Sequence, residues 1–237
     1  MALNKLLQAN VGNLLSKPWR IRKGIKAPTT DSVSLTDGGV SLDATILYAD
    51  LANSSKIATE IDKKAAAKTF KAFLTVTSRL IRKHAGSITS FDGDRVMGVF
   101  LGKRKCSRAA ICGLQINWAV NEILDPKLNS YFKTLRESEL EISHCVGVDT
   151  GNVLAVRGGV RGSNDLVWVG RAPNLAAKLS DIRNTNIRTC ISTTVFNALA
   201  EDAKYGGDPK QSIWTRYTHN WAGSEIYVYG SSWWWVP

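Results

Sequence analysis

Two carboxylates stand where strand-like runs of this sequence end. The run ATILYA is rich in apolar and β-favouring residues, which is typical of a buried strand, and Asp50 follows it at once. Further along, SITSF and RVMGVFL flank Asp92-Gly93-Asp94, and Asp-Gly between two β-type runs is a strong hairpin signal. If these strands are neighbours in a sheet, Asp50 and Asp94 converge.

Two converging carboxylates are what a pair of divalent cations needs. In such sites the metals lie ~3.5–4 Å apart and clamp the attacking and the leaving oxygens of a phosphoryl transfer. The carboxylates also supply an acceptor near the attacking hydroxyl, while the ions neutralise charge that grows on the phosphate chain. An aspartate at a strand end or in an Asp-Gly-Asp turn is common on protein surfaces. Other segments of the sequence are therefore needed to distinguish a metal site from ordinary surface residues.

The elements expected around these aspartates mix helices with hairpins. After the first strand, residues 44–49, the sequence predicts a helix over 60–84, a hairpin of 87–91 and 95–101, a helix over 107–124, a second hairpin of 141–148 and 152–156, a strand at 166–169, a helix over 173–182, a strand at 188–192, a helix over 194–200, and strands at 213–218 and 225–229. This order predicts an α+β fold, an α/β sandwich with an antiparallel-rich sheet covered by helices.

The remaining composition suits one catalytic domain with a basic extension. Residues 1–41 are expected to form a basic arm with a short helix over 4–15, and residues 42–237 are expected to form the catalytic domain. The net charge of +11 suits a polyanionic partner. Four cysteines without metal spacing are expected to be buried, reduced thiols. Without a membrane span or a signal peptide, the protein is expected in the cytoplasm.

Four segments taken together carry a family resemblance. ILYADLANSS, FDGDRVMGVF, VGVDTGNVLAVRGG and WVGRAPNLAAKLSDI resemble, in order and spacing, the catalytic domain of class III adenylate and guanylate cyclases over residues 42–230. The resemblance implies a ferredoxin-like core, two divalent cations (Mn²⁺ or Mg²⁺), and a head-to-tail homodimer. Each active site of that dimer takes metal aspartates from one protomer and substrate-orienting residues from the other.

The resemblance also assigns roles to individual residues. It implies that Asp50, Asp94 and the main-chain carbonyl of Leu51 bind metal, that the amides of Ala52, Asn53 and Ser54 meet the β and γ phosphates, that Asn174 orients the ribose, and that Lys178 stabilises the transition state.

Two positions depart from the family pattern. Lys178 stands where the family has an arginine, which keeps the charge but loses the bidentate fork; Arg171, Arg183 and Arg216 are possible substitutes. The lysine that usually grips the terminal phosphates has no match, and His219 or Arg216 is the candidate replacement.

The base-recognition positions point to an unusual substrate. Ser90 and, depending on alignment, Val167 or Trp168 stand where the family's purine-reading pairs are found. A bulky Trp168 shrinks the base pocket, and Tyr48 is a further candidate to line it. In these departures the chain resembles the stand-alone pyrimidine cyclases of bacterial antiphage defence. UTP is therefore the expected substrate, with CTP, ATP and GTP as alternatives.

Two rival interpretations belong to other classes. A basic RNA-binding module would use the N-terminal charges, but no RNP-like aromatic pattern is visible, so no nucleic-acid partner is expected. A degenerate cyclase domain that binds nucleotide and regulates a partner is suggested by Lys178 and the missing lysine, whereas the retained aspartate pair argues against it. The closing WWWVP is expected to pack against protein.

Overall fold

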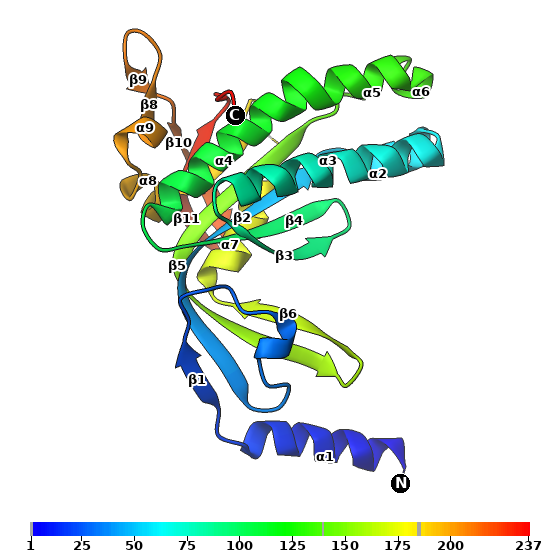
Figure 1. Ribbon diagram of the computed structural model, residues 1–237, viewed down its shortest axis with the longest axis vertical. Coiled ribbons are helices and arrows are strands. Elements are labelled where there is room, and N and C mark those ends of the chain that lie inside the picture. The colour runs from blue at the N-terminus through cyan, green and yellow to red at the C-terminus, as the bar shows by residue number, and fades with distance from the viewer. Residues whose placement is uncertain (1, 139, 184–185) are drawn as a thin grey trace.

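The computed structural model describes residues 2–138, 140–183 and 186–237, which build one large mixed sheet with helices on both faces (Figure 1). The helices are α1 (Leu3–Ser16), α2 (Ser54–Glu60), α3 (Lys63–Lys83), α4 (Lys105–Ala119), α5 (Asp125–Tyr131), α6 (Lys133–Arg136), α7 (Arg171–Ser180), α8 (Thr193–Asn197) and α9 (Glu201–Lys204). Two short helical turns are η1 (Thr30–Ser32) and the π-type η2 (Val120–Leu124). No described helix is long and apolar enough to cross a bilayer.

The strands are β1 (Arg20–Lys23), β2 (Gly38–Leu51), β3 (Ser87–Asp92), β4 (Arg95–Leu101), β5 (His144–Val160), β6 (Ser163–Val169), β7 (Thr189–Ser192), β8 (Tyr205–Gly206), β9 (Gln211–Ser212), β10 (Thr215–Trp221) and β11 (Ser224–Ser231). The large sheet runs β10-β11-β7-β5-β2-β4-β3, with β1 beside β2 and β6 beside β5. All of its neighbouring pairs are antiparallel except β1–β2 and β5–β7. The expected α+β architecture is confirmed.

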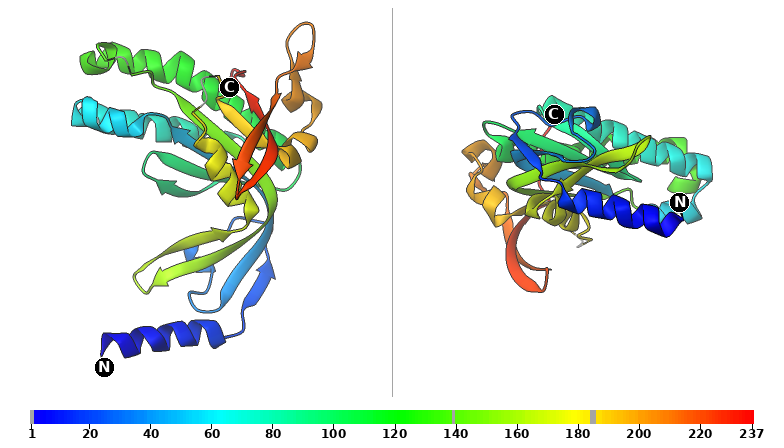
Figure 2. Two further views of the ribbon diagram at one scale, coloured as in Figure 1. Left: turned by 180° about the vertical axis from the view of Figure 1, so that it is seen from behind. Right: turned by 90° about the horizontal axis from the view of Figure 1, so that it is seen from below.

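Strand β2 lies inside the sheet between β5 and β4, and its side chains contribute to the core layers on both faces. Leu47, Ala49 and Leu51 belong to the larger core, which α3 and α4 cover. Alternate residues such as Ile46 point to the other face, where Met97 and the Ala176 side of α7 pack. Because side chains alternate along a strand, Asp50 belongs to the α7 face. Figures 1 and 2 show α3 and α4 on one side of the sheet and α7 on the other.

The expected hairpin around Asp149-Thr150-Gly151 is wrong. Strand β5 continues without interruption through these residues, because it pairs with β2 from Leu51↔His144 as far as Gly39↔Val156. A long central partner keeps the chain extended where the local glycine signal suggested a turn. The reversal comes later, between β5 and β6, where Gly162 has φ +86°.

The two ends of the chain behave differently. Helix α1 has no buried residue and lies apart at one end of the molecule (Figure 2). Strand β1 pairs with β2, and β2 itself crosses residue 42, so the division into an arm of 1–41 and a domain of 42–237 stays a prediction. At the other end, Trp233 and Trp235 pack on the large core of their own chain, and Asn117 Nδ2 donates to the Ser232 carbonyl at 2.9 Å.

The four cysteines lie buried as free thiols, as expected.

Candidate active site

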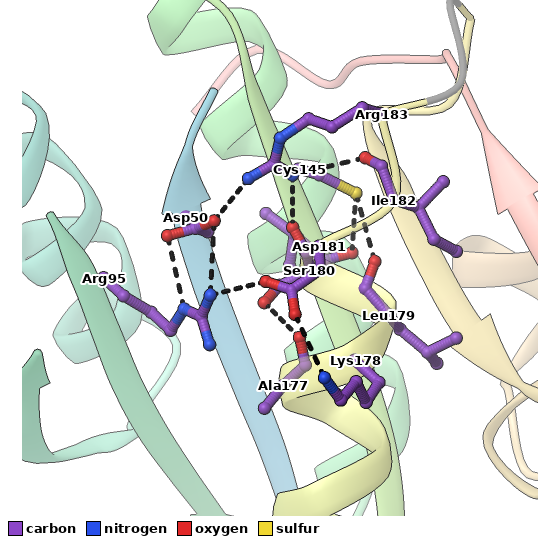
Figure 3. A network of polar contacts seen from close by, with 11 residues as sticks. Asp50, Arg95, Cys145, Ala177, Lys178, Leu179, Ser180, Asp181, Ile182 and Arg183 are labelled. Carbon is purple, nitrogen blue, oxygen red and sulfur yellow. Dashed lines mark hydrogen bonds and ion pairs between the residues drawn. The ribbon is translucent and has the colours of Figure 1, made fainter. Parts of the chain in front are cut away.

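Asp50 is buried at the end of β2, and two arginines neutralise it. Its side chain is 7% exposed. Arg95 Nε donates to Asp50 Oδ1 at 3.2 Å, and Arg183 Nη2 donates to Asp50 Oδ2 at 2.5 Å (Figure 3). Arg95 stands opposite Asp50 in the β2–β4 register, whereas Arg183 follows α7 in the sequence. The first expected metal ligand is therefore held between two guanidinium groups.

A second carboxylate extends this network toward α7. Arg95 Nη2 donates to Asp181 Oδ1 at 2.5 Å, and Lys178 Nζ lies 3.9 Å from Asp181 Oδ2 (Figure 3). The Lys178 side chain remains 68% exposed. The structure therefore joins Asp50 to the last turn of α7 through alternating charges.

Asp94 follows the turn residue Gly93, which has φ +60° and makes the expected hairpin possible. Its Oδ2 atom is buried and has no hydrogen-bond partner among the described residues. Burial raises the pKa of Asp94, and the charge of Asp50 raises it further; a hydrogen bond from Ser54 acts in the opposite sense. An unpartnered, buried carboxylate oxygen close to a second carboxylate is an environment that a divalent cation would stabilise.

The side-chain ligands available to a cation are these two aspartates. Among the described ranges, no group of three or more His, Cys, Asp or Glu side chains is arranged to hold a metal ion. Further ligands would have to come from main-chain carbonyls, such as that of Leu51, or from a substrate. Leu51 is fully buried and stands opposite His144 in the pairing of β2 with β5. The expectation that its main-chain carbonyl binds a metal stays a prediction.

The loop after β2 agrees only in part with the expected phosphate contacts. The Ala52 amide donates to the Ser143 carbonyl at 2.8 Å and would have to give up this bond to meet a phosphate, so its expected role stays a prediction. Asn53 has φ +59°, a left-handed conformation that asparagine tolerates, and it stands directly before α2 without a side-chain capping bond to that helix. Ser54 begins that helix, where amides lack helical partners.

A cationic cavity of about 290 Å³ lies beside this loop. It is lined by Ala52, Asn53, Glu141, Ser143, His144, Ile182, Arg183, Ile187 and Arg188. Arg183 therefore faces both the cavity and Asp50. Burial, assisted by the charges of Arg188 and Arg183, lowers the pKa of His144 to about 3, so that this histidine is neutral. The lining holds two arginines against one glutamate, and this excess of positive charge suits an anion.

The expected base-pocket residues share the α7 face of the sheet. Tyr48 and Ser90 both stand opposite Met97, one from β2 and one from β3. Trp168, on β6, packs against the same core, and its Nε1 atom is buried without a described partner. Burial raises the pKa of Tyr48, which stays a neutral phenol. The three side chains are therefore set into one core layer.

The remaining candidate residues lie in different parts of the structure. Asn174 is exposed on α7, one turn before Lys178. Arg171 lies 3.6 Å from the buried Asp149, and Arg216 packs over the Tyr227 ring. Arg216 and His219 lie on β10 at the opposite end of the sheet order from β3 and β4. Of the substitute cations, the structure brings Arg183 to Asp50.

Arg95 and Asp181 were missed by the sequence reasoning. Arg95 follows Asp94 directly, and a cation next to a suspected metal ligand is a signal that was available. Asp181 lies one residue beyond α7 and carries no local signal, because its role depends on how that helix packs.

The curated proteins that this chain resembles over its full length carry one and the same name. No family model matches the chain. It is 42% identical over 237 residues to a uridylate cyclase of Rhodovulum sp. (strain MB263), covering 100% of this chain and 99% of the relative. A uridylate cyclase of Burkholderia cepacia is 36% identical, with 100% of both chains covered, and one of Xanthomonas perforans is 35% identical, with 99% of both chains covered.

Solved structures agree on the fold. The guanylyl cyclase Cya2 matches with a TM-score of 0.67 at 20% identity, covering 84% of this chain and 96% of that one. A bacterial light-regulated adenylyl cyclase matches with a TM-score of 0.64 at 19% identity, covering 83% of this chain and 53% of that one. At this identity the likeness concerns the fold.

Proposed function

This chain belongs to the uridylate cyclase family of class III nucleotidyl cyclases, and on that premise we propose that it converts UTP to 3′,5′-cyclic UMP and diphosphate at a two-metal site. The ribose 3′-hydroxyl oxygen forms a bond to the α-phosphorus while the bond from that phosphorus to the bridging oxygen of the β-phosphate breaks. The hydroxyl proton passes to a carboxylate or to water, and diphosphate leaves.

The observation that carries the proposal is the pair formed by the buried Asp50 and the half-buried Asp94, whose buried Oδ2 atom has no described hydrogen-bond partner. Divalent cations bound there, Mn²⁺ or Mg²⁺, would neutralise the phosphate chain and lower the pKa of the attacking hydroxyl. The two carboxylates would hold the ions, and Asp50 is already positioned by its arginines. The chemistry requires no covalent nucleophile.

Arg183 is the best-supported replacement for the missing phosphate lysine. Its guanidinium reaches Asp50 and also lines the cationic cavity beside Asn53. A guanidinium offers several N–H donors in a planar fork that suits phosphate oxygens. We therefore assign the terminal phosphates to this cavity, with the exposed Lys178 serving the transition state.

The residues proposed to contact the base support a pyrimidine substrate. Trp168 and Tyr48 pack in the same core layer, and the buried Trp168 Nε1 is a donor without a described partner. Uracil carries carbonyl acceptors, so a base carbonyl would satisfy this indole N–H. A single pyrimidine ring also needs less room than a purine. CTP and ATP remain the alternative substrates, and a degenerate nucleotide-binding domain is the alternative function.

A homodimer completes the proposed site. Asn174 and Lys178 lie on the exposed side of α7, where they are open to a second copy of the chain. In the family arrangement they would serve the aspartates of the partner protomer.

A role for the cyclic nucleotide as a signal in antiphage defence follows from the resemblance. Its test is whether phage protection by the intact system disappears when Asp50 is replaced by asparagine.

The biochemical test supplies ATP, GTP, CTP or UTP with Mn²⁺ to the purified chain and resolves the products by chromatography. Cyclic UMP is the expected main product, and dominant cyclic AMP would refute the assignment. Asp50→Asn and Asp94→Asn are expected to lower the rate at least about 10³-fold. Asp92→Asn is the matched control, because this exposed carboxylate lies in the same hairpin.

A further inference from the structure

Helix α3 carries an uncompensated row of positive charge. It contains seven lysines and arginines and no acidic residue. Its exposed side presents a basic stripe, defined as Lys64, Lys68, Lys71, Arg79 and Arg82. These residues follow at spacings of four, three, eight and three, which keeps them on one side of a helix over about 27 Å. Within the described residues, no carboxylate forms an ion pair with them.

Hollows flank this stripe on both sides. A groove of about 820 Å³ separates α3 from β3 and is lined by Lys71, Leu74, Thr75, Ser78, Arg79, Arg82, Ile88 and Phe91. A second hollow of about 420 Å³, toward η2 and α5, shares Lys68 and Lys71 and adds Lys127. The two hollows share Lys71 and Thr75, so the cations line a surface that is larger than a single small ligand requires.

The larger groove has an apolar side and an unsatisfied hydroxyl. Phe91 is 57% exposed there, with Ile88 next to it on the same face of β3. The Ser78 Oγ atom is buried without a described hydrogen-bond partner. An exposed aromatic ring between cations offers a stacking surface for a base, while the cations suit the phosphates that link successive bases.

We propose that the basic stripe and its groove bind a single strand of nucleic acid. An anionic membrane is a poorer fit, because a membrane-binding helix exposes large apolar residues and α3 exposes none. A duplex would keep its bases stacked away from Phe91. The absence of an RNP-like sequence pattern argued against a nucleic-acid partner. The surface proposed here is not a sequence motif, because the cations of α3 lie beside Phe91 only when α3 packs next to β3.

This surface is separate from the cyclase site. Ile88 and Phe91 face α3, whereas Ser90 and Asp50 belong to the α7 side of the sheet. Substitutions in the basic stripe therefore leave the proposed catalytic residues in place, and the proposal does not depend on UTP being the substrate. Cyclase activity serves as the control for folding.

The experiment measures fluorescence anisotropy of a labelled 12-nucleotide oligo-U with the full chain, at several salt concentrations. Affinity for a single strand changes with salt by about 0.7 for each phosphate contact on logarithmic axes. The variant Lys71→Ser, Arg79→Ser, Arg82→Ser is expected to flatten the slope by about 2 and to weaken binding about 10²-fold at 0.1 M salt. Phe91→Ala is expected to weaken binding without changing the slope.

The matched control replaces three exposed cations of β1, Arg20→Ser, Arg22→Ser and Lys23→Ser, with the same change in net charge. It is expected to retain binding within a few-fold. Binding lost through β1 and retained in the α3 variant would overturn the proposal. Equal affinity for a duplex, or binding to anionic phospholipid vesicles and not to the oligonucleotide, would also overturn it.

Discussion

Gly147 lies where α7 crosses β5, and its replacement by alanine is expected to damage both stability and catalysis. A Cβ atom at this position would lie 2.0 Å from the Ala176 carbonyl oxygen and 2.4 Å from the Ser180 amide nitrogen. Both neighbours are main-chain atoms of α7, so no side-chain rotation relieves the clash. The whole helix has to move away from the sheet.

The size of this movement sets the size of the effect. Restoring an ordinary contact of about 3.4 Å requires a shift of about 1.4 Å. Overpacking of this kind costs about 3 kcal/mol, which lowers the melting temperature of a chain this long by about 6–12 °C. Because α7 carries Asn174 and Lys178, a displacement above about 1 Å is also expected to lower kcat about 10²-fold.

The assay combines thermal unfolding by circular dichroism with kcat measured on saturating triphosphate. Gly151→Ala is the control, since Gly151 lies on the same strand and an added Cβ there has nothing within 4 Å. Melting temperatures within a degree of each other and equal turnover rates in the two variants would refute the predicted clash with α7. Loss of stability with unchanged kcat would separate helix docking from catalysis.

Three further predictions use other parts of the site. Lys178→Ala is expected to lower kcat about 10²-fold with an unchanged melting temperature, because the side chain is 68% exposed, while Lys178→Arg keeps most activity; equal losses in both would contradict a charge role. Trp168→Ala is expected to raise turnover of ATP relative to UTP in a competition assay, and an unchanged ratio would remove Trp168 from base selection. The third concerns His144, whose pKa is lowered from 6.5 to about 3 by burial. The unfolded chain takes up this proton below about pH 6.5, so stability is lost as the pH falls, by about 2 kcal/mol at pH 5. His144→Gln is expected to flatten this loss in urea titrations at pH 7.5 and 5, and an unchanged pH dependence would exclude His144 as its source.

From the sequence, the places where strands end could be predicted better than which strands pair with each other. Asp50 and Asp94 were located because an apolar strand-like run and an Asp-Gly turn are local signals, and the β3–β4 hairpin forms where these signals predicted it. The hairpin expected at Gly151 failed for the complementary reason: pairing with β2 outweighs a local turn preference. A local turn signal therefore predicts a strand end only where the segment does not pair with a long neighbouring strand.

The charges around Asp50 show a different limit. Arg95 is adjacent to Asp94 in the sequence, but Arg183 is 133 residues from Asp50 and reaches it only because α7 docks on β5. No periodicity encodes such a meeting. The resemblance to cyclases supplied Asn174 and Lys178 by motif, and it had no motif with which to rank Arg183 above Arg171 or Arg216.

A single extra residue in β3 decides how this strand serves both faces of the sheet. The register moves from Ile88↔Gly98 to Ser90↔Met97, which leaves Thr89 as an unpaired bulge. Without the bulge, Ile88 and Ser90 would point to the same side, because side chains alternate strictly along a regular strand. With it, Ile88 shares the α3 groove with Phe91, and Ser90 joins Tyr48 beside Met97. The bulge is therefore what allows one short edge strand to line the proposed nucleic-acid groove and the proposed base pocket at once.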